Sequence, residues 1–69
     1  MQSLQAYQAL LSRQENLAKV WAMRAIIEQS GGRLEFEPPT MNGFVVVTLW
    51  LPQHLHPTDF LLEVPFYPV

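Results

Sequence analysis

The feature that most constrains this chain is where its helix-breaking residues stand. From Ser3 to Ser30 there is neither glycine nor proline, whereas all six prolines follow Glu37. Proline removes a backbone donor, and glycine costs about 1 kcal/mol relative to alanine inside a helix. A helix is therefore favoured in the first half of the chain only, and the sequence divides into a helical region and an extended region.

The first region has the composition of one long helix. Ala, Leu, Gln, Glu, Lys and Arg dominate it, Ser3 can cap its start, and Gly31-Gly32 can supply the left-handed residue that ends it. The sequence predicts a helix over residues 3–30, which at that length is about 40 Å long. The segment "SRQE", from Ser12 to Glu15, has the capping-box form and marks the place where the helix would break instead. We expect a continuous helix or a mild kink there.

The second region, residues 33–69, has the pattern of strands separated by turns. "RLEFE" alternates apolar and acidic residues, "PPTMNG" is typical of a turn, and "FVVVTLWL" is apolar on both faces. A strand of the last kind belongs in the middle of a sheet, covered on both sides. Pro65 cannot donate to a ladder and confines the last extended segment to a sheet edge. The predicted fold is α+β, a single small domain in which one long N-terminal helix packs on a two- to three-stranded antiparallel sheet.

The composition predicts that the chain associates with another protein surface. Of 69 residues, 49% are hydrophobic and only 14% are charged, against roughly 25% charged in average soluble proteins. From Leu17 to Ile27 the helix is apolar nearly all round, so one small sheet would cover only one side of it. We expect a homo-oligomer, with a dimer as the first guess, and a further protein partner. The expected role is that of a non-enzymatic interaction or regulatory module. The predicted interface residues are Val20, Trp21, Met23, Ile26, Ile27, Trp50, Val64, Phe66 and Tyr67.

Several other classes of protein are disfavoured by the sequence. There is no cysteine, so neither disulfides nor thiolate metal sites are available. The start lacks the pattern of a signal peptide, and the longest apolar run, "FVVVTLWLP", is about half of the ~20 residues that cross a membrane. We therefore expect a cytoplasmic protein that does not enter a membrane. Residues 34–69 hold four acids and no base, which disfavours nucleic-acid binding.

Two groups of side chains could carry chemistry. His54 and His56 point the same way on an extended segment, and Asp59 follows them, as in a zinc site. A complete site needs ligands from elsewhere, and a solvated loop is the favoured interpretation. Glu35 and Glu37 share one strand face, but a catalytic carboxylate pair needs a concave pocket. We expect no cofactor, no metal and no enzyme activity. A small ligand- or metal-binding protein or enzyme, with a site formed between subunits from these residues, stays as the alternative.

One segment is similar to a known family. The stretch "IIEQSGGRLEFEP", a turn containing Gly43 and the strand "FVVVTLWLP" follow one another. Residues 17–52 thereby resemble the C-terminal portion of a histidine-kinase ATPase domain of the GHKL superfamily. The resemblance implies a helix, a Gly-Gly turn and two antiparallel strands packed on that helix. At the place of the family's glycine-rich lid this chain has "NLAKVW", whose side chains block the close approach that phosphates require. The resemblance therefore implies no ATP site, although it allows a partner in a sensor-kinase system.

Overall fold

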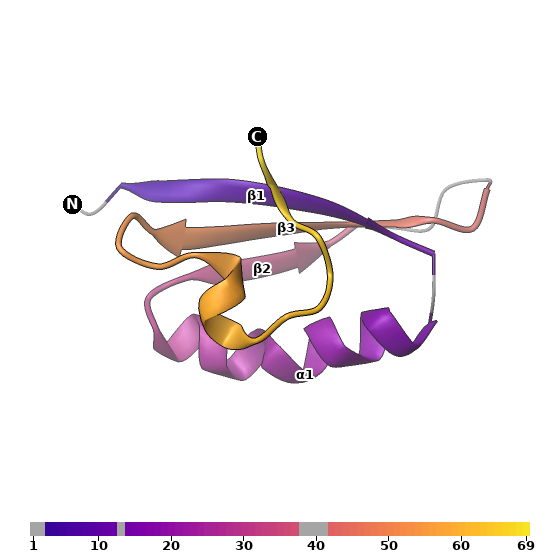
Figure 1. The fold of residues 1–69 in the computed structure, drawn as a ribbon, viewed down its shortest axis with the longest axis horizontal. Coiled ribbons are helices and arrows are strands. Elements are labelled where there is room, and N and C mark those ends of the chain that lie inside the picture. The colour runs from indigo at the N-terminus through magenta and orange to yellow at the C-terminus, as the bar shows by residue number, and fades with distance from the viewer. Residues whose placement is uncertain (1–2, 13, 38–41) are drawn as a thin grey trace.

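The computed structural model describes residues 3–12, 14–37 and 42–69. The chain forms a four-stranded antiparallel sheet with a single helix lying along one face of it (Figure 1). In chain order the elements are β1 (Leu4–Leu11), α1 (Gln14–Gln29), β2 (Arg33–Phe36), β3 (Val45–Pro52), the 3-10 turn η1 (Pro57–Phe60) and β4 (Tyr67–Pro68). The order of strands across the sheet is β2-β3-β1-β4.

The α+β class is confirmed, but two parts of the predicted fold are wrong. The helix does not extend over residues 3–30, because Leu4–Leu11 form a strand and the helix begins at Gln14. The sheet has four strands rather than two or three, because β1 inserts between β3 and β4. The break falls at the predicted capping-box segment, in which Arg13 lies outside the described residues. Of the predicted turn over residues 38–43, residues 38–41 likewise lie outside the described residues.

Pairing with β3 explains why the first segment is a strand despite its helix-forming composition. β1 pairs with β3 over its full length, from Leu4 opposite Pro52 to Leu11 opposite Val45. Helix propensity differs between ordinary residues by only a few tenths of a kcal/mol, so tertiary pairing and burial override it. The helix that remains has 16 residues and is about 24 Å long, close to the roughly 27 Å of an eight-residue strand. Helix and sheet therefore match in length.

Two adjacent glycines join α1 to β2, each for a different reason. Gly31 has φ +90, and its N–H donates to the carbonyl of Glu28 while that of Gly32 donates to the carbonyl of Ile27. These bonds form the Schellman motif that closes a helix. A Cβ at Gly32 would lie 2.5 Å from the backbone oxygen of Trp50. Only glycine at that position lets the chain turn back so close to β3.

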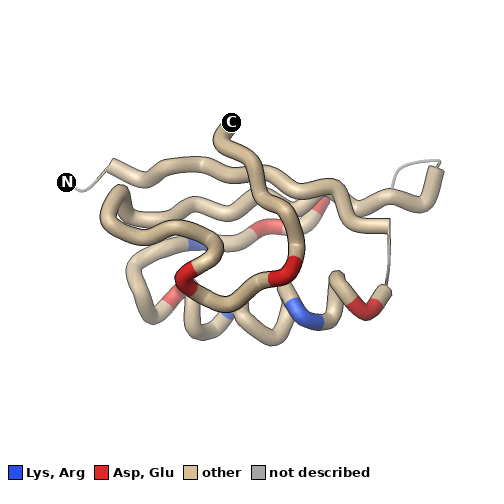
Figure 2. Tube along the Cα trace, viewed as in Figure 1, with Lys and Arg blue, Asp and Glu red and all other residues tan. Residues whose placement is uncertain are grey.

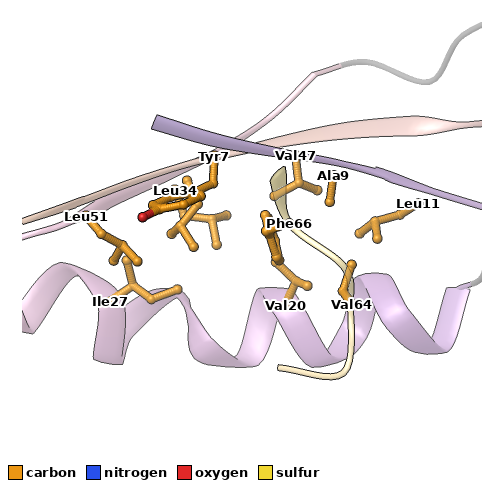
Figure 3. Close-up of a cluster of buried hydrophobic side chains, with 11 residues drawn as sticks. Tyr7, Ala9, Leu11, Val20, Ile27, Leu34, Val47, Leu51, Val64 and Phe66 are labelled. Atoms are coloured by element: carbon orange, nitrogen blue, oxygen red, sulfur yellow. The ribbon is translucent and has the colours of Figure 1, made fainter. Parts of the chain in front are cut away.

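The core lies between α1 and the sheet face that α1 covers (Figure 3). Alternate residues of β1 and β3 point into it, as strand geometry requires. The C-terminal segment after η1 lies on the same side of the sheet as α1 (Figure 1) and supplies the remaining cover. The buried residues of this core are Tyr7, Ala9, Leu11, Val20, Ile27, Leu34, Val47, Leu49, Leu51, Val64 and Phe66.

Several sequence-based expectations are met by this topology. β3 is an interior strand, as predicted from its two apolar faces, and β4 lies at an edge of the sheet, as predicted from Pro65. The helix, the Gly-Gly turn and two antiparallel strands follow one another in the expected order. The relation to the ATPase family itself stays a prediction. Within the described residues, no helix is both long and apolar enough to cross a membrane.

Candidate functional site

The sheet face that points away from α1 is the most distinctive surface of the chain, and we call it the open face. No helix, strand or turn of the described chain lies on it, whereas α1 and η1 both lie on the opposite side (Figure 1). Strand alternation and the pairing registers assign its residues. They are Leu4, Ala6, Gln8 and Leu10 of β1, Val46, Thr48 and Trp50 of β3, Arg33 and Glu35 of β2, Tyr67 of β4, and the neighbouring Glu37 and Val69.

Cross-strand pairing arranges most of these residues in three rows, each named after its β3 member. The Trp50 row holds Ala6, Trp50 and Arg33, and the Thr48 row holds Gln8, Thr48 and Glu35. The N–H of Glu37 donates to the carbonyl of Val46 at 2.8 Å, which continues the register by one further pair. The third, the Val46 row, therefore holds Leu10, Val46 and Glu37.

The open face is apolar over most of its area and partly exposed to solvent. Leu4 is 42% exposed, Leu10 61% and Tyr67 67%, whereas Val46 and Trp50 are half-buried. β1, β3 and β4 contain no charged residue, and Figure 2 shows the charges on α1, on and directly beside β2, on η1 and on the C-terminal segment. A hollow of about 380 Å³ lies beside Leu10, Val46 and Tyr67. Several exposed apolar side chains on one face are typical of a protein interface.

Polar groups on the open face are concentrated in the middle row and along β2. Gln8 Nε2 donates to Thr48 Oγ1 at 3.4 Å, so the central polar pair is satisfied within the chain. The Arg33 guanidinium lies 5.1 Å from the centre of the Trp50 ring and forms an ion pair with Glu35. A cation over an indole face stabilises the ring's orientation. The aromatic and charged residues along this side of the face are therefore held in place.

A second apolar surface lies on the other side of the molecule, between the start of α1 and the ends of β2 and β3. This helix-side groove has a volume of about 450 Å³ and is lined by Leu17, Ala18, Trp21, Phe36 and Val45, with Gln14 and Glu37 at its border. The rings of Trp21 and Phe36 are 4.9 Å apart, and Arg24 lies 5.1 Å from the Trp21 ring. Trp21 is 54% exposed, so it forms a wall of the groove.

The nine predicted interface residues are divided between core and surface. Val20, Ile27, Val64 and Phe66 are buried in the chain's own core, so their side chains face α1 or the sheet instead of solvent. Trp21 and Ile26 are exposed on α1, and Met23 is half-buried there. The structure brings only Trp50 and Tyr67 together on the open face. Sequence reasoning missed Leu4, Ala6, Leu10 and Val46, because three of them stand in the strand that was predicted as helix.

The residues considered for chemistry serve local structure. His56 caps η1, since its Nδ1 accepts from the Thr58 N–H, and Asp59 Oδ2 accepts from the His56 N–H at 2.5 Å. The His56 ring also contacts Tyr7 edge-on, with centroids 5.3 Å apart. His54 is exposed in the preceding turn. Among the described residues, no three His, Asp or Glu side chains are close enough to hold a metal ion.

One ion pair fastens the C-terminal segment to the helix. Lys19 Nζ lies 2.7 Å from Glu63 Oε2, and both side chains are largely exposed. The hydrogen bond and positive charge of Lys19 lower the pKa of Glu63, and the same contact raises the pKa of Lys19. This contact holds residues that lead into Val64 and Phe66, which close the core.

Comparisons with known proteins identified no relative of this chain. No family model matches the sequence, and neither a curated protein nor a solved structure matches it. Inference about function therefore rests on the surfaces described above.

Proposed function

We propose that this chain is a non-enzymatic protein–protein interaction module that self-associates through its open face. The observation that carries the proposal is the contrast between the two sides of β3. Val47, Leu49 and Leu51 are fully buried under α1. On the other side, Val46 and Trp50 are half-buried and Thr48 between them is 8% exposed, and no element of the described residues lies over them. A strand that is apolar on both sides is suited to cover on both sides.

The size of the open face sets the strength that we expect of this association. The eight-residue strands β1 and β3 each span roughly 27 Å, the four-residue β2 about 14 Å and the two-residue β4 about 7 Å, and each strand adds about 4.8 Å to the width of the sheet. The face therefore measures about 400 Å² in projection, and two copies about 800 Å², before side-chain relief is counted. Specific interfaces bury about 1,200–2,000 Å² in total. The projected area lies below that range, so we expect a weak dimer that dissociates on dilution.

The test is the mass in solution, measured by light scattering after size exclusion across a dilution series. We expect the natural chain to be dimeric at high concentration and monomeric when dilute. Leu10→Lys places a charge on the open face and should abolish the dimer, because the charge would be desolvated at the interface. Leu61→Lys is the matched control, since Leu61 is 90% exposed and lies on the C-terminal segment.

Each outcome of this experiment is informative. Loss of the dimer in Leu10→Lys and its retention in Leu61→Lys supports the open face as the interface. The reverse result would move the interface to the C-terminal side and overturn this assignment. A natural chain that stays monomeric at the highest concentration would refute self-association.

The helix-side groove supports a second candidate function, the binding of a small apolar ligand or a partner side chain. Its volume of about 450 Å³ lies within the ~300–1,000 Å³ of ligand pockets. An occupant would contact the Trp21 ring and change its fluorescence. A Trp50→Phe variant, in which Trp21 is the remaining tryptophan, makes that signal specific to the groove.

A further inference from the structure

The three rows of the open face fit the three rows of a second copy whose strands run in the opposite direction. In this arrangement a two-fold axis lies between the two facing sheets, perpendicular to the strands and above the Thr48 row. Rotation about this axis places the Trp50 row of one copy opposite the Val46 row of the other. Along β1, the small Ala6 then faces the large Leu10. Along β3, the large Trp50 faces the smaller Val46. Packing of a small against a large side chain lets two sheet faces interdigitate.

Under the same rotation the charges on either side of the axis are complementary, whereas Glu35, which lies on the axis, faces Glu35 of the other copy and is paired with Arg33 of its own chain. On the β2 side of the face, the Trp50 row ends in Arg33, and the Val46 row ends in Glu37, which directly follows β2 and also borders the helix-side groove. The rotation brings Arg33 of each copy toward Glu37 of the other, which forms two equivalent pairs of opposite charge. Opposite charges across an interface fix its register and disfavour other arrangements.

We infer that a second copy of this chain binds the open face about a two-fold axis that crosses the strands over the Thr48 row, with Arg33 of each copy paired to Glu37 of the other. The inference deepens the proposed self-association and rests on it. A two-fold interface uses the same patch on both copies. The large and small side chains of β1 and β3 and the opposite charges of Arg33 and Glu37 meet this condition. A two-fold axis parallel to the strands would instead place β2 of one copy opposite the β1 and β4 half of the other copy's sheet. These two strands carry no charge, so the charges of β2 would have no partner there.

Two further features of the face bear on this arrangement. The Thr48 row lies on the axis, where each residue faces its own copy. The Gln8–Thr48 hydrogen bond satisfies the central polar groups of this row, and Arg33 of the same chain offsets the charge of Glu35. Trp50 of the second copy lies opposite Val46, beside the hollow of about 380 Å³ that Leu10, Val46 and Tyr67 line. The hollow thus provides space for an indole ring larger than the valine it faces.

A charge exchange between copies tests the arrangement. Arg33→Glu gives a chain with two acids at these positions, and Glu37→Arg gives a chain with two bases. Each variant alone should dimerise about tenfold more weakly than the natural chain, because both intermolecular pairs become repulsive. An equimolar mixture of the two variants should form a heterodimer with both pairs restored. The double variant Arg33→Glu/Glu37→Arg should recover dimerisation in a single chain.

Recovery of dimerisation in the mixture distinguishes loss of the intermolecular Arg33–Glu37 pair from loss of contacts within one chain. Arg33→Glu also removes the stacking of Arg33 on Trp50 and the ion pair with Glu35, and the mixture does not restore these. If the mixture dimerises no better than either variant, this geometry is overturned. The proposed self-association survives that result provided that the natural chain still dimerises and Leu10→Lys does not.

A crosslink provides a second readout that does not depend on charge. The chain has no cysteine, so Gln8→Cys introduces a single thiol next to the axis. A short bis-maleimide should join two copies of this variant efficiently. Leu4→Cys is the matched control, because the axis places it about 27 Å along the strand from its own image. Efficient joining of Leu4→Cys without joining of Gln8→Cys would overturn the position of the axis.

Discussion

The two faces of the central sheet are built from similar side chains and have different surroundings. On β3, Val47, Leu49 and Leu51 have no exposed surface under α1, while Val46 and Trp50 on the opposite side are half-buried. Apart from Thr48, the strand is apolar on both faces, so composition distinguishes the faces only at that position. The difference lies in the cover, because the described part of the chain supplies one helix and one C-terminal segment and places both on the same side.

The polar groups refine this comparison. The covered face contributes no charged residue to the core cluster, whereas the open face carries Arg33 and Glu35 along β2 and the Gln8–Thr48 pair in its middle row. Such a face tolerates water when it is uncovered and still presents leucine and tryptophan to a partner. A surface that is covered for part of the time has these properties, in agreement with a dimer that dissociates on dilution.

The largest effect is expected when the same Leu→Ala substitution is made on each face of the sheet, at Leu49 of β3 and at Leu10 of β1. Leu49→Ala removes a fully buried side chain from the covered face and should lower the free energy of unfolding by about 3 kcal/mol, through lost burial and the cavity left behind. A domain of this size has a total of only about 3–10 kcal/mol, so the variant should be near its limit of stability. Urea unfolding followed by circular dichroism measures this change.

The matched variant is Leu10→Ala on the open face, where the leucine is 61% exposed. At concentrations at which the chain is a monomer, it should lower the free energy of unfolding by about 0.5 kcal/mol or less. At high concentration it should weaken the dimer. Equal losses of stability for the two variants in the monomer would show that the open face is as well covered as the core.

A smaller effect is expected in the segment that completes the cover. Leu61 has φ 56, a left-handed conformation, and its side chain is 90% exposed. Left-handed backbone costs an ordinary residue roughly 1–2 kcal/mol, and asparagine adopts it more readily. Leu61→Asn should therefore raise the free energy of unfolding by about 1 kcal/mol, measured by urea unfolding. Leu61→Ala keeps the Cβ and should change stability little, so an equal gain in both variants would assign the effect to removal of an exposed leucine.

The sequence predicted the second half of the fold better than the first. The Gly-Gly turn, the central position of β3 and the edge position of the last strand all depend on local chemistry that one segment carries by itself. β1 was missed because its alanine, leucine and glutamine residues favour a helix, and its strand conformation depends on pairing with β3, more than 30 residues away. The capping-box segment at Ser12 was the available signal, together with the mismatch between a 40 Å helix and a 27 Å strand.

The candidate site was predicted less well than the fold, for the same reason. Trp50 and Tyr67 were predicted as interface aromatic residues, but their surface is completed by Leu4, Ala6 and Leu10 of β1. Val20 and Ile27 were selected because the helix is apolar nearly all round, and the actual pairing buries them against the sheet. The C-terminal segment provided cover that the sequence pattern does not specify.

The smallest expected effect concerns the ion pair that fastens this cover. Lys19 lowers the pKa of Glu63 from its ordinary value of 4.5, and Glu63 raises the pKa of Lys19 above 10.5. Because the folded pKa of Glu63 is the lower one, its contribution to stability is present above pH 4.5 and is lost as the pH falls through the folded value. The raised pKa of Lys19 implies that the contribution is lost again at strongly alkaline pH.

Glu63→Gln should therefore be slightly less stable than the natural chain at neutral pH and equally stable near pH 2. Because both side chains are exposed, added salt should reduce the difference. Thermal unfolding at both pH values, with and without salt, measures it. A difference that persists unchanged at low pH would show that the contact acts through packing of the Glu63 stem and not through its charge.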